Sequence, residues 1–276
     1  MTELPPSKSD KPEVKEELPL LGHLVELRNR LVWCTGILLL AIVGSYFFAK
    51  DIYGFLVEPL AAAMKGQGAE VPRRLIYTNL TEAFFTYMGV AVWAGFFVTA
   101  PFILIQIWRF MAPGLYANEK KIIAPYLFLT PFLFYAGAAA AYYLVFPAAW
   151  HFFLSFENGG GASGLPIQLE ARVGDYLSLA MSMILAFGFA FELPLVLILL
   201  VHLGVLGTQQ LKSFRRYAIV INFILAAIIT PPDVISQLSL AIPLCLLYEV
   251  AIGIAGIIDK KKSAKDKSGA RDIVKA

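Results

Sequence analysis

Four long apolar runs dominate this sequence. Each has about 20 residues or more, and a helix of that length, rising 1.5 Å per residue, crosses the roughly 30 Å hydrocarbon core of a bilayer. Hydrophobic residues make up 58% of the 276 residues and charged residues 16%, against about half and a quarter in soluble domains. The chain is therefore predicted to be a polytopic membrane protein, which excludes a soluble enzyme, a disordered protein and a disulfide scaffold. The four runs are Leu31–Ala49, Phe84–Ile107, Ile122–Phe146 and Tyr176–Val201.

The remaining apolar sequence is divided by the tetrapeptide Thr230-Pro231-Pro232-Asp233. Two prolines remove backbone donors and favour a turn, so two further helices are expected, Tyr217–Ile229 and Val234–Ile258. The fifth run has only 13 residues and would reach about 20 Å. The predicted fold class is an all-α membrane protein with six transmembrane helices, arranged as a concave bundle with short fifth and sixth spans.

The distribution of lysine and arginine predicts the orientation. Of the 23 basic residues, 18 lie in the two tails and the even-numbered loops and only five in the odd-numbered loops. Because cytoplasmic segments carry the excess of positive charge, both termini are expected in the cytoplasm. The predicted units are a polar tail (1–18) without the features of a secretory signal, a six-span domain (19–258) and a charged, disordered tail at the lipid surface (259–276).

The two long loops on the other side, 50–82 and 147–175, contain Gly, Pro and aromatic residues. This mixture suggests caps over the helix ends rather than folded domains. Pro59, in the first of these loops, is expected to lie in a simple turn.

Enzyme motifs are missing from the sequence. It contains no HExxH, GxSxG or Walker lysine, and its three histidines belong to separate loops or helix ends. We therefore expect no catalytic residue, no metal site, no cofactor and no nucleic-acid partner. Cys34 and Cys245 both lie in apolar runs and are expected to be reduced, packed thiols.

Several short blocks occur in a fixed order along these six runs. They read HLVELRNRL, FFTYM, RFMAPGLYANEKK, FGFAFELPL, TPPDVISQ and AIPLCLLYE. From His23 to Lys260 the chain closely resembles TatC, the multispanning receptor of the twin-arginine protein translocase. The resemblance implies a bacterial inner-membrane protein that binds twin-arginine signal peptides of folded cargo. It also implies TatA- and TatB-like single-span partners, self-association in the complex and transport that uses the proton gradient.

The segment Pro19–Leu31 is predicted to be an amphipathic helix at the cytoplasmic surface, because its leucines recur at helical spacing. From the residues alone, Glu26 is best explained by an i,i+4 ion pair with Arg30. The resemblance instead assigns Glu26 and Arg28 to signal-peptide binding.

Glu119 could simply begin a helix capped by Asn118, where the helix dipole favours an acid. The predicted topology nevertheless places Glu119 on the same side as Glu26, and two carboxylates suit a pair of guanidinium groups. The resemblance adds Glu119 and the nearby Phe110 to the signal-peptide contacts, although an aromatic at this depth is more often an interface anchor.

Glu192 lies inside the fourth apolar run, where an acid costs about 2.5–3.5 kcal/mol on insertion scales. It could be a hydrogen-bonded acid that orients helices, but we expect a polar site that receives a partner's polar group. Glu249 is a second intramembrane candidate that could extend to the membrane surface or pair with a neighbouring span. The alternative function is an ion- or proton-coupled small-solute transporter that uses Glu192 and Glu249.

Asp233 and Gln237 are one turn apart at the start of the sixth run. Asp233 would by itself be explained as a helix cap. The resemblance assigns both residues to partner contacts.

Overall fold

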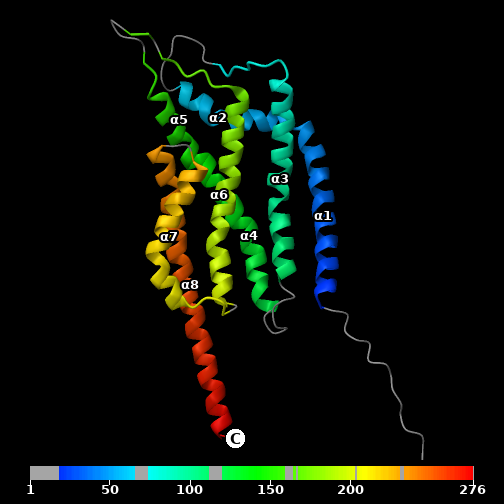
Figure 1. Ribbon diagram of the computed structural model, residues 1–276, viewed down its shortest axis with the longest axis vertical. Coiled ribbons are helices and arrows are strands. Elements are labelled where there is room, and N and C mark those ends of the chain that lie inside the picture. Colours follow the sequence, from blue (N-terminus) through cyan, green and yellow to red (C-terminus); the bar gives the residue numbers. More distant parts are fainter. Residues whose placement is uncertain are drawn as a thin grey trace, which may run out of the picture.

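The computed structural model describes residues 19–65, 74–111, 120–158, 164–165, 167–202, 204–230 and 233–275. Within these ranges the chain is almost wholly helical, with two isolated β-bridges. Its helices form the elongated bundle of Figure 1. In chain order they are α1 (Pro19–Phe47), α2 (Ala49–Lys65), α3 (Glu82–Met111), α4 (Lys120–Ala140), the π-helical turn η3 (Ala141–Val145), α5 (Phe146–Leu154), α6 (Val173–His202), α7 (Thr208–Ile229) and α8 (Val234–Lys275).

Five helical segments of the described chain are long and apolar enough to cross a membrane. This is the pattern of a multi-pass membrane protein. The predicted fifth span, in α7, is not among them, because the first three turns of α7 carry Lys212, Arg215 and Arg216. The six-span count and the cytoplasmic termini therefore stay predictions. The five segments are Gly22–Phe47, Glu82–Phe110, Pro125–Leu154, Val173–His202 and Val234–Asp259.

Two expectations about the last helices are wrong. The span in α8 is not short, since Val234–Asp259 has 26 residues. The charged tail is not disordered over 259–275, because α8 continues to Lys275 and its last turns extend beyond the bundle (Figure 1). The charged residues there do not break the helix because Ala, Lys and Arg all have high helix propensity.

The expectation of a simple turn at Pro59 is also wrong. Pro59 lies inside α2, which crosses one end of the bundle (Figure 1). Proline has no N–H, so the carbonyl of Phe55 lacks its i→i+4 partner in the helix. The hydroxyl of Tyr142 in η3 donates to that carbonyl at 2.8 Å. The buried Leu56 and Leu60 then hold α2 on the bundle core.

The helix α6 has the most buried span of the five and contacts α3, α4 and α8. In contrast, α1 packs mainly along α3. Gly95 makes that approach possible, because a Cβ atom there would lie 2.6–2.8 Å from three atoms of Ile42 on α1. This close pairing of α1 with α3 sets the position of the site described next.

Candidate functional site

A pocket of about 600 Å³ lies between α1 and α3, near the end of the bundle opposite α2. The first turns of α1 and the last turns of α3 form its walls. Its chemistry is mixed, with one acid, two arginines, two amides and two aromatic rings. The lining residues are Gly22, Val25, Glu26, Asn29, Arg30, Trp33, Phe102, Gln106 and Arg109.

Glu26 is joined to Arg30 one helical turn away. The Arg30 Nε donates to Glu26 Oε1 at 3.0 Å and its Nη2 donates to the same oxygen at 2.5 Å. A third donor, Nη1, reaches Gln106 Oε1 of α3 at 2.9 Å. The second carboxylate oxygen lies 3.9 Å from His23 Nδ1. The i,i+4 pair expected from the residues alone is therefore confirmed, and Arg30 also bridges α1 to α3.

Phe110 lies close to this pair. Its ring stacks on His23, with centroids 4.0 Å apart and planes inclined by 14°, and His23 in turn faces Glu26. Arg28 is exposed and does not line the pocket; its Nη2 donates to Asn29 at 3.3 Å. The structure thus brings Glu26 and Phe110 together and leaves Arg28 outside. Glu119 lies outside the described residues.

Three lining residues of this pocket, Gln106, Arg109 and Trp33, were not predicted from the sequence. Gln106 and Arg109 are three residues apart on α3 and therefore share one face of the helix. The signal available in the sequence was these two polar residues at the end of an otherwise apolar run.

Glu192 is enclosed between α6 and α4. The residue is 5% exposed, and its carboxyl group faces Thr130 and the backbone of Phe134 on α4. In this conformation a partner's polar group would reach the acid only after α4 and α6 moved. The polar site predicted here stays a prediction.

Glu249 lies about half exposed on α8, and Arg215 of α7 contacts both of its carboxylate oxygens, at 2.6 and 2.8 Å. The expectation that Glu249 pairs with a neighbouring helix is confirmed. Because Glu192 faces α4 and Glu249 faces α7, the structure does not join the two acids into one path.

Asp233 begins α8 as a helix cap. Its Oδ2 accepts the N–H of Ser236 at 2.6 Å, and the residue is 3% exposed. Gln237 donates from Nε2 to the carbonyl of Phe223 on α7 at 3.2 Å. The capping role is confirmed, and the partner contacts of both residues stay predictions.

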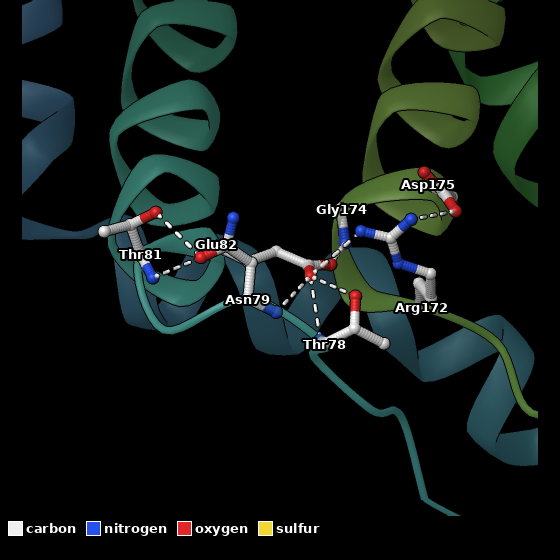
Figure 2. Close-up of polar contacts among 7 residues, drawn as sticks. All are labelled: Thr78, Asn79, Thr81, Glu82, Arg172, Gly174 and Asp175. Atoms are coloured by element: carbon white, nitrogen blue, oxygen red, sulfur yellow. Dashed lines mark hydrogen bonds and ion pairs between the residues drawn. The ribbon is translucent and has the colours of Figure 1, made fainter.

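A polar cluster that the sequence analysis missed joins α3 to α6 near the α2 end of the bundle. Figure 2 shows the Glu82 carboxylate at its centre, with Arg172 Nη2 donating at 3.1 Å. The carboxylate also accepts N–H groups from the segment before α3 and from the first turn of α6, and it raises the pKa of Arg172. The only signal in the sequence was that Arg172 is the single base of its loop. The backbone donors are Thr78, Asn79 and Gly174.

The arrangement suits binding rather than covalent chemistry. Among the side chains that the structure describes, no group of three His, Cys, Asp or Glu residues could hold a metal ion. Glu26 can accept from a guanidinium group, and the aromatic rings of Trp33 and Phe102 offer apolar contact beside it.

Comparisons with known proteins agree on one family. The family model described as "Sec-independent protein translocase protein (TatC)" matches residues 22–243. The chain is 46% identical over 245 residues to the TatC protein of Rickettsia prowazekii, covering 89% of this chain and 95% of that protein. It is 35% identical to Escherichia coli TatC, covering 87% and 88%.

A crystal structure of a protein described as "Twin Arginine Translocase Receptor- TatC" has the same fold. It superposes with a TM-score of 0.71 at 36% identity, covering 86% of this chain and 99% of that one. TatC proteins are components of a translocase and not enzymes. With matches over most of its length, the chain belongs to the TatC family and is a multi-pass membrane component of Sec-independent protein translocation.

Proposed function

We propose that this protein is the receptor subunit that binds twin-arginine signal peptides. The observation that carries the proposal is the position of Glu26, which lines the α1–α3 pocket beside the stacked rings of His23 and Phe110. A solved relative with 36% identity is described as a twin-arginine translocase receptor, which supports the same function here.

Arginine recognition follows from the chemistry of the carboxylate. A guanidinium group presents parallel N–H donors that match a carboxylate in a fork, whereas a lysine ammonium makes a point contact. Glu26 would accept one arginine of the pair, and Glu119, expected on the same side of the membrane, would accept the other. Arg28 and Phe110 would contact the peptide around them.

The apolar part of the signal would insert along the helices. An apolar pocket of about 340 Å³ between α3, α4 and α6 supports this step, since its walls include Trp93, Phe97 and Met181. The protein would lie in a bacterial inner membrane with both termini in the cytoplasm, and the signal would enter from that side.

Partner subunits complete the proposed cycle. TatA- and TatB-like single-span proteins would gather near Glu192, Glu249, Asp233 and Gln237, together with further copies of this chain. No nucleotide-binding motif occurs in the sequence, so the proton gradient would supply the energy. A small-solute transporter using Glu192 and Glu249 is not favoured, because the two acids face different helices.

The test is binding of a labelled twin-arginine peptide to the detergent-purified protein. A peptide with Lys-Lys in place of Arg-Arg controls for charge, and the variants Glu26→Gln and Glu119→Gln remove each acceptor. We expect tight binding of the Arg-Arg peptide alone, weakened in both variants. Equal binding of both peptides, unaffected by the two substitutions, would reject the receptor function.

A further inference from the structure

Arg30 already makes, within the chain, the contact that the proposal assigns to the signal peptide. Two of its donors lie on Glu26 Oε1, at 3.0 and 2.5 Å, and a third holds Gln106 at 2.9 Å. The exposed fractions of the Arg30 and Glu26 side chains are 21% and 33%. One oxygen of the carboxylate that would accept the peptide is therefore occupied by an arginine of the same protein.

We propose that Arg30 is an internal competitor that occupies Glu26 when no peptide is bound and thereby lowers the affinity for the signal peptide. This inference rests on the proposed function, in which Glu26 accepts a signal arginine. Arg30 and Arg109 both line the pocket, so an arriving cation meets two like charges around a single acid. Since like charges repel across a few ångströms, the peptide's arginine binds fully only when Arg30 leaves Oε1.

Arg30 has a second partner that does not depend on Glu26. Its Nη1 is held by Gln106, which belongs to α3 and not to α1. The guanidinium group can pivot about this hydrogen bond and release Glu26 while it remains anchored. Because the group is partly exposed, water can solvate the donors that the carboxylate gives up.

The exchange has the same cost for every ligand. Whichever cation replaces Arg30, Glu26 first loses the two N–H donors on Oε1. Competition therefore weakens the binding of the Arg-Arg and Lys-Lys peptides by the same factor, and the preference for arginine comes from the guanidinium geometry alone. An i,i+4 pair that stayed closed during binding would leave both affinities unchanged when Arg30 is replaced.

The experiment measures dissociation constants of the labelled Arg-Arg and Lys-Lys peptides for the detergent-purified full chain. Arg30→Gln removes the competitor, and Arg30→Lys keeps its charge but not its fork. Arg109→Gln is the matched control, because it removes a charge that lines the same pocket and has no ion pair among the described residues. The thermal unfolding midpoint of each variant establishes that it is folded.

With Arg30→Gln we expect the Arg-Arg peptide to bind about two- to fivefold more tightly, the range set by a partly exposed ion pair. The Lys-Lys peptide should gain by a similar factor, so the ratio of the two constants stays close to that of the wild type. Arg30→Lys keeps a weaker competitor and should tighten both peptides by less. Arg109→Gln removes a lining charge without freeing Glu26 and should also tighten both peptides by less than Arg30→Gln does.

The inference and the proposed function fail in different ways. If the wild type prefers Arg-Arg but Arg30→Gln binds the peptide no more tightly than the wild type, or Arg109→Gln tightens binding as much as Arg30→Gln does, Arg30 is no competitor and the receptor function stands. If Arg30→Gln does not fold, Arg30→Lys decides the question alone. If the wild type binds both peptides equally and Glu26→Gln has no effect, the receptor function fails first.

Discussion

The hydrogen bond from Tyr142 to the Phe55 carbonyl exists because Pro59 cannot provide one. Tyr142→Phe removes the hydroxyl and keeps the ring, which stacks on Phe55 with centroids 4.3 Å apart and planes at 2°. The substitution therefore leaves the aromatic contact in place and deprives a partly buried carbonyl of its donor. Pro59→Ala restores the missing N–H, so the carbonyl can accept a normal helical bond.

The expected cost of Tyr142→Phe is about 1 kcal/mol, the net value of a single hydrogen bond, because the Phe55 carbonyl is only partly buried. In the Pro59→Ala background the carbonyl has another partner, and the same substitution should cost about half as much or less. Pro59→Ala alone changes the entropy of the unfolded chain. This effect cancels in the double-mutant cycle, which leaves only the coupling between positions 59 and 142.

The measurement is the free energy of unfolding of the four proteins in the same detergent, by denaturant titration followed through tryptophan fluorescence. A coupling of about 0.5 kcal/mol or more, with Tyr142→Phe tolerated better in the Pro59→Ala background, supports the reasoning. Equal costs in both backgrounds would mean that the hydroxyl does not replace the donor that proline lacks.

Three further predictions concern the contacts between helices. Gly95→Ala places a Cβ 2.6–2.8 Å from Ile42 and should cost about 1–3 kcal/mol by overpacking, measured as a lower unfolding midpoint and weaker peptide binding. Gly89→Ala on the same helix has nothing within 4 Å, so an equal loss there would contradict the close α1–α3 contact. Asp233→Ala removes the cap on Ser236 and should cost about 0.5–2 kcal/mol; unchanged stability would reject the capping role. Arg215→Glu or Glu249→Arg alone should lower the free energy of unfolding by less than about 1 kcal/mol, because the ion pair is half exposed. The double variant with both substitutions should restore it, and a double variant no more stable than the single variants would refute the pairing.

Local sequence patterns predicted the long apolar helices and the family. Apolar runs such as Tyr176–Val201 are long enough to need a helix, since no other single segment satisfies its backbone inside a bilayer. The pair of Glu26 with Arg30 and the cap at Asp233 were also predictable, because their partners lie within one turn of the same helix. Boundaries were less certain where charged residues follow an apolar run: α8 continues past Asp259, because helix propensity and not hydrophobicity decides its end.

Only the tertiary structure decided which distant segments are in contact. Arg30 meets Gln106 across 76 residues, Tyr142 meets Phe55 across 87 and Arg172 meets Glu82 across 90. Periodicity along one helix determines which face is polar but not which helix that face will meet. That choice depends on how closely helices approach, as Gly95 permits for α1 and α3, and on which backbone groups lack partners, as at Phe55. The sequence by itself therefore determined a helical translocase component, and the packing determined which charges share a pocket and are able to compete within it.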